Sequence, residues 1–163
     1  MSSPARTVPG DAQRVLLDVN VLAISLVADH PGYEYVRPEL DAGVASSFEP
    51  LVFDAHPLRA QYIMTTDFQV DRVAARNSVQ SLLRQPVRFV GASRDVLLDA
   101  YELSAELDHD VYDCFLLALG LDHGVDCLLT TDTDFNQLCG DVALTYVNPV
   151  PPTVLERFHG DGG

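Results

Sequence analysis

The chain has 163 residues, of which 47% are apolar, and this is enough for one domain with a hydrophobic core. It carries a formal net charge of −14, and all ten basic residues are Arg. This charge argues against non-specific binding to nucleic acid, but it does not exclude a local groove lined by Arg. No segment approaches the length of a membrane span, and the polar first residues do not resemble a signal peptide.

Short apolar strands and helices alternate along the chain. Residues 1–13 are expected to form a flexible arm, residues 14–148 the domain, and residues 149–163 a tail in which prolines end regular structure. Strands are expected at 14–18, 86–90, 127–130 and 142–147, and 45–53 is ambiguous between strand and loop. Helices are expected at 21–27, 33–42, 57–64, 71–83, 93–107 and 110–124. The alternation predicts a three-layer α/β fold with a mostly parallel central sheet.

An acidic surface without Lys is typical of proteins from a very salty cytoplasm, where ions screen the repulsion between carboxylates. We therefore expect a halophilic archaeal source, and the alternative is a GC-rich genome that favours Arg codons. The cysteines Cys114, Cys127 and Cys139 lie in or beside apolar segments and do not have the spacing of metal ligands. They are expected to be reduced, structural thiols of a cytoplasmic protein.

Carboxylates follow two of the expected strands and open the helix between them. Asp18 ends the first strand, Asp132 and Asp134 follow the strand at 127–130, and Asp113 lies at the start of the preceding helix. If these strands are neighbours, the four acids converge on one crevice beyond the carboxyl ends of the sheet. Mg²⁺ and Mn²⁺ prefer oxygen ligands, lower the pKa of a bound water and stabilise charge on a phosphoryl group. The sequence therefore predicts a divalent-metal site.

Each acid also has a plain structural interpretation. Asp113 can form a capping pair with Asp110, and Asp132 or Asp134 alone can be a turn acid. In a chain this acidic a single Asp carries little information, so the prediction depends on the joint placement of the acids at strand ends.

Three sequence blocks resemble the signature blocks of the PIN domain family. They are LLDVNVL at 16–22, YDCFLLAL at 112–119 and LLTTDTDF at 128–135, and the segment DHP at 29–31 resembles a loop of VapC-type toxins. Their order and separation also match, over about residues 14–147. The resemblance implies a Mg²⁺- or Mn²⁺-dependent endoribonuclease with a central parallel sheet, the toxin of a VapBC-type toxin–antitoxin pair.

The resemblance also implies roles for particular residues. Asp18, Asp113 and Asp132 are implied to be acidic site residues that hold the metal, with Asp134 as an auxiliary ligand or water-orienting group. Asn20 matches a polar position beside the first acid, where it would orient a ligand or water.

The sequence departs from the family in the middle of the chain. The family usually carries a further acid there, most often Glu, on a helix. The matching helix at 57–64 contains no acid, and Arg59 stands in the corresponding position. Asp54 could replace the acid after a shift in register, and Glu49 is a poorer candidate.

Contacts to the substrate are less specific in the sequence. Arg59 could bind a substrate phosphate, and Arg72 and Arg76, i,i+4 neighbours on an expected helix, are further candidates. The alternative for each is a solvated or ion-paired surface Arg. His56 and His109, near the predicted site, are assigned no role.

Two other functions stay open at this point. The first is a catalytically degenerate PIN module that binds RNA or a protein partner, which the Arg at position 59 favours. The second is a phosphohydrolase of another doubly wound fold with Asp18 as nucleophile; such folds usually have a second Asp where this chain has Asn20.

The partners expected from the resemblance are RNA, an antitoxin protein and a second copy of the chain. The apolar surface for a homodimer or for an antitoxin helix would come from 21–27, Tyr33, Tyr35 and 57–64. The alternative is that these residues belong to the core.

Overall fold

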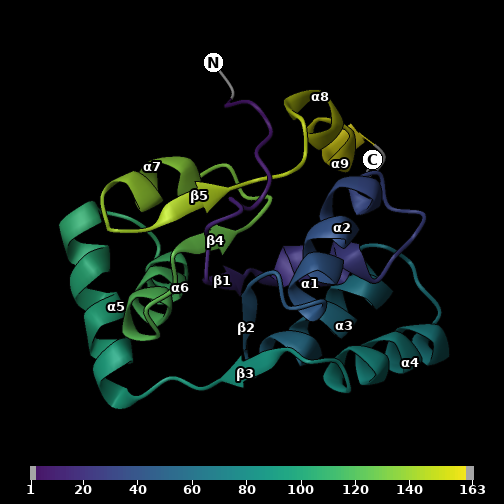
Figure 1. Cartoon of the computed structure of the whole chain (residues 1–163), viewed down its shortest axis with the longest axis horizontal. Coiled ribbons are helices and arrows are strands. Elements are labelled where there is room, and N and C mark those ends of the chain that lie inside the picture. Colours follow the sequence, from purple (N-terminus) through teal and green to yellow (C-terminus); the bar gives the residue numbers. More distant parts are fainter. Residues whose placement is uncertain (1–2, 161–163) are drawn as a thin grey trace.

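A five-stranded, all-parallel sheet forms the middle layer of the molecule (Figure 1). This is a computed structural model, and it describes residues 3–160. In chain order the strands are β1 (Arg14–Leu17), β2 (Glu49–Phe53), β3 (Arg88–Val90), β4 (Cys127–Leu129) and β5 (Thr145–Val147). Their order across the sheet is β3-β2-β1-β4-β5, so the predicted three-layer α/β fold is confirmed and β1 and β4 are neighbours.

Helices cover both faces of this sheet. They are α1 (Val19–Ser25), α2 (Tyr33–Val44), α3 (His56–Thr66), α4 (Arg72–Leu83), α5 (Arg94–Leu107), α6 (Val111–Asp122), α7 (Phe135–Gly140), α8 (Pro152–Leu155) and α9 (Arg157–Gly160). Figure 1 shows α5, α6 and α7 on one side of the sheet and α1–α4 on the other. None of the helices between residues 3 and 160 is long and apolar enough to cross a membrane.

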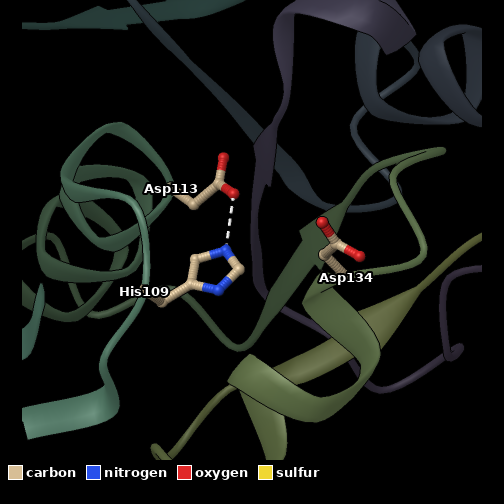
Figure 2. A group of neighbouring side chains, drawn as sticks. All are labelled: His109, Asp113 and Asp134. Atoms are coloured by element: carbon tan, nitrogen blue, oxygen red, sulfur yellow. Dashed lines mark hydrogen bonds and ion pairs between the residues drawn. The ribbon is translucent and has the colours of Figure 1, made fainter.

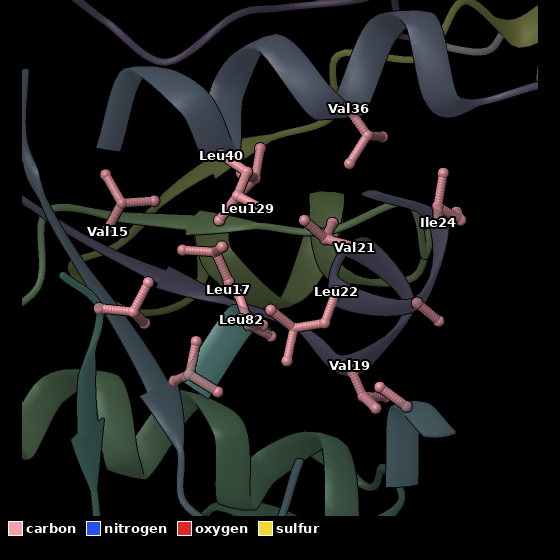
Figure 3. Packing of buried hydrophobic residues seen from close by; sticks show 14 of the residues in the cluster. Val15, Leu17, Val19, Val21, Leu22, Ile24, Val36, Leu40, Leu82 and Leu129 are labelled. Atoms are coloured by element: carbon pink, nitrogen blue, oxygen red, sulfur yellow. The ribbon is translucent and has the colours of Figure 1, made fainter. Parts of the chain in front are cut away.

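The alternation of side chains along β1 divides the core into two clusters. Leu16 points into the cluster under α5, α6 and α7, whereas Val15 and Leu17 point into the cluster under α1–α4 (Figure 3). On β4, Leu128 lies in the cluster under α5, α6 and α7, and Leu129 lies in the cluster under α1–α4. The central strands are therefore buried on both faces, which explains their uninterrupted apolar sequences.

Helix ends follow the capping signals in the sequence. The carboxylate of Asp71 accepts hydrogen bonds from the backbone of Val73 and Ala74 at the start of α4, and Ser93 caps α5 in the same way. Gly124 has a φ of +64° just after α6, a conformation that favours glycine. The predicted stop of this helix near Gly124 is confirmed.

The ambiguous segment 45–53 contains strand β2, which lies inside the sheet although its second residue is Pro50. The amide of Glu49 donates to Gln13, toward β1, and the amide of Asp54 donates to Val90, toward β3. Because amides alternate in direction along a parallel strand, the Pro50 nitrogen faces β3. Strand β3 begins opposite Leu51, so Pro50 removes no hydrogen bond from the ladder.

Three short helices, α7, α8 and α9, were not predicted. The expectation that the prolines of the tail end regular structure is wrong within residues 149–160, because Pro152 occupies the first turn of α8. A proline is well tolerated there, since the first amides of a helix have no partner within the helix.

The N-terminal segment is hydrogen-bonded to the domain, and Val150 and Val154 of the C-terminal segment belong to the core cluster under α1–α4. The amide of Arg6 donates to the carbonyl of Asn148, and the amide of Val8 donates to the buried carboxylate of Glu39. The flexibility of the first 13 residues stays a prediction. Residues 21–25 are fully buried in the core, so this part of the expected apolar surface is not available to a partner.

Candidate active site

Asp18 lies where β1 passes into α1, at the centre of the carboxyl edge of the sheet. Its amide donates to the Leu129 carbonyl at 2.9 Å, which extends the ladder between β1 and β4 by one residue. Its carboxylate accepts hydrogen bonds from the Val19 amide at 2.7 Å and from the Thr130 hydroxyl at 2.8 Å. The side chain is therefore fixed in one position at the start of α1.

The environment of Asp18 disfavours its charged form. The residue is 4% exposed, and this burial raises the pKa of its carboxyl group to about 6. The hydrogen bonds from Thr130 and Val19 lower the pKa, whereas the charges of Asp132 and Asp113 raise it further. These two acids therefore act electrostatically on Asp18, as expected for groups that share one crevice.

Asp132 follows β4 and is both a turn acid and a neighbour of Asp18. Its amide donates to the Thr130 hydroxyl at 3.0 Å, and its carboxylate accepts from the amide of Asp134 at 3.0 Å. Burial raises the pKa of Asp132, and the charges of Asp134 and Asp113 add to this effect. Thr130 links the two acids, because its hydroxyl donates to one and accepts from the backbone of the other.

Asp113 lies in the first turn of α6, but its carboxylate does not cap the helix. Asp110 is the cap, and its carboxylate accepts from the amides of Tyr112 and Asp113 at 2.9 and 3.4 Å. The Asp113 carboxylate instead lies 2.8 Å from Nε2 of His109 (Figure 2). The side chain of Asp113 is therefore directed toward the other site residues.

A second grouping adds Asp134 and His109 to Asp113. One potential ligand atom from each of these three residues lies within 4.8 Å of the other two. Figure 2 shows Asp134 approaching the pair from the segment between β4 and α7. The hydrogen bond with Asp113 raises the pKa of His109, and the charges of Asp113, Asp134 and Asp110 act in the same direction.

His109 has no role predicted from the sequence, yet it belongs to this group of potential ligands. The available signal was the i,i+4 spacing between His109 and Asp113 at the start of a helix, which places two side chains on one side of the first turn.

Asn20 lines the same cleft as Asp132, whereas Asp54 does not join the acids. Asn20 is half-buried and lines, together with Asp132, a cleft of about 1450 Å³. The carboxylate of Asp54 faces Gly91, beyond β3, and its charge is not among those that shift the pKa of Asp18 or Asp132. Because α3 carries no acid, the carboxylates of the site come from the edge formed by β1, β4 and α6.

The three candidate arginines lie on two helices. Arg59 is exposed on α3, with its guanidinium 5.0 Å from the centre of the Tyr62 ring. Arg72 and Arg76 are exposed on α4, which packs against α3, and the structure does not bring them to the acids. Their contact with a substrate stays a prediction.

In a comparison with protein-family models, residues 15–141 match the PIN domain. This span includes Asp18, Asp113, Asp132 and Asp134 and most of the sheet. The chain belongs to the PIN domain family.

Solved structures share the fold of this PIN domain at low sequence identity. VapBC2 of Rickettsia felis, bound to a DNA fragment from its promoter, matches with 13% identity, a TM-score of 0.64 and coverage of 83% of this chain and 98% of the other. VapC20 of Mycobacterium tuberculosis, a toxin that cleaves the sarcin–ricin loop, matches with 15% identity and a TM-score of 0.62, over 80% of this chain and 98% of the other. A toxin–antitoxin complex from Klebsiella pneumoniae matches with 19% identity and a TM-score of 0.57, over 84% of this chain and 98% of the other. A comparison with curated proteins gave no significant match.

The donor atoms in this PIN domain fit a divalent cation. Carboxylate oxygens are the preferred ligands of Mg²⁺ and Mn²⁺, and an imidazole nitrogen is also a common ligand of transition metals. Burial raises the pKa of Asp18 and of Asp132, and the charges of neighbouring acids raise both further, so a bound cation would offset the cost of keeping these carboxylates ionised.

Proposed function

We propose that this PIN-domain protein is a Mg²⁺- or Mn²⁺-dependent endoribonuclease, acting in the cytoplasm as the toxin of a VapBC-type pair. The observation that carries the proposal is the group of Asp113, Asp134 and His109, whose potential ligand atoms lie within 4.8 Å of one another in a PIN domain. The charges of Asp113 and Asp132 also act on Asp18, which supports a shared site for these acids. The toxin and toxin–antitoxin structures with the same fold support it, including the toxin described as cleaving the sarcin–ricin loop.

Different residues of the site would have different roles in this reaction. Asp18, Asp113 and Asp132 would hold the cation, with Asp134 and His109 as further ligands or as groups that orient water. The bound cation would supply Lewis acidity and stabilise the charge that develops on a phosphodiester. Thr130 fixes the orientation of Asp18, and Asn20, beside Asp132 in the cleft, would orient a ligand or water.

A catalytically degenerate PIN module is the second candidate, and a specific observation favours it. Helix α3 has no acid, and Asp54 faces Gly91 instead of replacing it. Such a module would bind RNA or a protein without cutting RNA. A phosphohydrolase of another doubly wound fold loses support, because the chain belongs to the PIN family.

Incubation of the protein with labelled structured and single-stranded RNAs tests the two candidates. We expect cleavage in the presence of Mn²⁺ or Mg²⁺ and none with excess EDTA. RNA binding without cleavage under any divalent cation would instead support the degenerate module.

His109→Ala is expected to weaken Mn²⁺ binding by about 10-fold, the lower end of the range for residues that support metal ligands. Because Asp113 raises the pKa of His109, a proton competes with the cation, so affinity should fall as the pH is lowered from 8 to 6 in the parent protein. Calorimetric titration of RNA-free protein measures both effects. His123→Ala, at the other end of α6, is the matched control, and equal affinities of the two variants would exclude His109 from the site.

Assembly as a homodimer is also proposed. Helix α5 exposes three large apolar side chains, Leu97, Leu98 and Tyr101. A contiguous exposed apolar patch of this kind is typical of a surface that binds another protein chain. Light scattering at molar salt, which screens the repulsion between two chains of charge −14, should give the dimer mass. A monomer mass throughout the micromolar range would contradict the proposal.

An antitoxin is the remaining proposed partner. An amphipathic helix of such a protein would bind an apolar groove of the toxin. A small open reading frame beside the gene is the observation expected from a toxin–antitoxin pair.

A further inference from the structure

A buried histidine and a half-exposed tyrosine lie beside the acids, on the side from which α3 approaches. His56 is the first residue of α3 and is 1% exposed, and its Nε2 lies 3.0 Å from the hydroxyl of Tyr112 in α6. The His56 ring packs edge-on against Phe53, with ring centres 5.3 Å apart. Neither residue is used by the proposed metal site.

The surroundings of His56 favour one tautomer. Burial lowers the pKa of His56 to about 4, so the ring is neutral near pH 7 and only one of its nitrogens carries a hydrogen. Nδ1 is buried and has no hydrogen-bond partner among residues 3–160. Buried donors without an acceptor are rarer than buried acceptors without a donor, so the hydrogen belongs on Nε2. Nε2–H then donates to the Tyr112 oxygen.

This arrangement leaves the hydroxyl hydrogen of Tyr112 available to another acceptor. The side chain of Tyr112 is 48% exposed, so its hydroxyl can reach a bound molecule. Burial raises the pKa of Tyr112, and the charge of Asp18 raises it further, so the phenol lies within electrostatic reach of the acid at the centre of the site. A tyrosine hydroxyl carries its hydrogen at neutral pH, so it can act as a hydrogen-bond donor.

Arg59 adds a positive charge to the same side of the site. It lies one turn after His56 on α3, and its charge lowers the pKa of Tyr112, opposite to the effect of Asp18 and Asp113. No ion pair joins Arg59 to an acid within the described part of the chain. The crevice thus has a carboxylate side, which suits a cation, and a donor side, which suits an anion.

We infer that Arg59 and Tyr112 together bind one backbone phosphate of the RNA, and that His56 is a positioning residue that keeps the Tyr112 hydroxyl as the donor. The inference rests on the proposed nuclease function. A guanidinium and a hydroxyl are the groups that commonly contact phosphate oxygens, and they occupy the side of the site where α3 brings no carboxylate.

Binding of a labelled single-stranded RNA, measured by fluorescence anisotropy with Ca²⁺ in place of Mn²⁺, tests the subsite apart from cleavage. Tyr112→Phe should weaken binding about 10-fold, as expected for one hydrogen bond to a charged group. Arg59→Gln should weaken it to a similar extent and reduce the slope of the salt dependence by about one. Arg88→Gln, at the start of β3 and at the amino end of the sheet, is the matched control and should bind as the parent does.

Two variants and one spectrum test the positioning role of His56. His56→Gln keeps an N–H donor near the position of Nε2 and should retain most of the affinity, whereas His56→Leu should match Tyr112→Phe. If His56→Leu does not fold, the ¹⁵N shifts of the parent protein decide, because they show directly which ring nitrogen is protonated. A hydrogen on Nδ1 would overturn the positioning role.

The outcomes separate the subsite from the nuclease proposal. RNA binding that depends on Arg59 and Tyr112, in a protein that does not cleave RNA, would support the subsite and refute the nuclease. Cleavage by a protein whose Tyr112→Phe variant binds RNA as tightly as the parent would refute the subsite and leave the nuclease standing. A parent protein that binds no RNA would refute both.

Discussion

Replacing Asp18 by Asn is expected to abolish Mn²⁺-dependent cleavage of RNA. Loss of a residue that only supports a metal ligand typically costs 10- to 100-fold, so loss of a central ligand should cost at least about 100-fold. A fluorogenic RNA substrate measures the effect, with circular dichroism to show that the variant is folded. Unchanged nuclease activity would remove Asp18 from the mechanism.

The same variant is expected to be more stable than the parent at pH 8. The pKa of Asp18 is about 6 in the folded protein, above the ordinary value of 3.8, so ionisation of this carboxyl group destabilises the fold. The difference corresponds to at most about 3 kcal/mol above pH 7, and it shrinks to about half of that at pH 5, where the folded-state carboxyl is mostly protonated.

The amide of the Asn side chain offsets part of this gain, because it cannot accept the Thr130 hydroxyl in the way that Asp18 Oδ2 does. We therefore expect a net gain of about 1–2 kcal/mol at pH 8, measured by urea unfolding in the presence of a chelator.

Asp126→Asn is the matched control for this prediction. Asp126 lies at the amino end of the sheet, directly before β4, where its carboxylate accepts hydrogen bonds from the amides of Gln13 and Arg14. These bonds lower the pKa of Asp126, so removal of its charge should destabilise the protein at pH 8 and leave RNA cleavage unchanged. A loss of stability in both variants would contradict the argument from the burial of Asp18.

Leu17→Ala is expected to lower the free energy of unfolding by about 2–5 kcal/mol, the usual range for a fully buried leucine. Leu17 is completely buried in the cluster under α1–α4, directly before Asp18 (Figure 3). A loss of this size is a large part of the stability of a typical domain. Because the chain has no Trp, far-UV circular dichroism is the suitable probe of urea unfolding.

Leu58→Ala provides the comparison for Leu17→Ala. Leu58 is 75% exposed on α3, so its truncation should change the free energy of unfolding by less than about 0.5 kcal/mol. Similar values for the two variants would mean that the β1 side chain is not packed as described.

The sequence was sufficient to predict the central part of the fold. Apolar runs such as those of β1 and β4 fit strands covered on both faces, and the helices flanked by Asp71, Ser93 and Asp110 begin with strong caps. Helix α7 was missed because its six residues are too few to show helical periodicity. Strand β2 stayed ambiguous because the position of Pro50 is acceptable only when the register of β3 is known.

In the candidate site, the sequence predicts where the acids lie along the chain, but not where their side chains point or which distant residues they contact. The placement of Asp18, Asp113 and Asp132 at strand and helix ends follows from local patterns and from the pairing of β1 with β4. The direction of a side chain does not follow from such patterns: Asp54 also ends a strand, yet it faces Gly91. The contact between His56 and Tyr112 joins residues 56 positions apart, so no local pattern could indicate it.

The two halves of the acidic cluster are held in different ways, and this affects how the site can change. The amide of Asp18 is bonded into the buried pairing of β1 with β4, so it should exchange with solvent hydrogen only when the whole molecule unfolds. The amide of Asp134 is bonded to a side chain in an exposed turn, where a local fluctuation is enough to release it. We therefore expect mutations in the turn before α7 to adjust the affinity for the proposed cation, while the central acid stays tied to the integrity of the sheet.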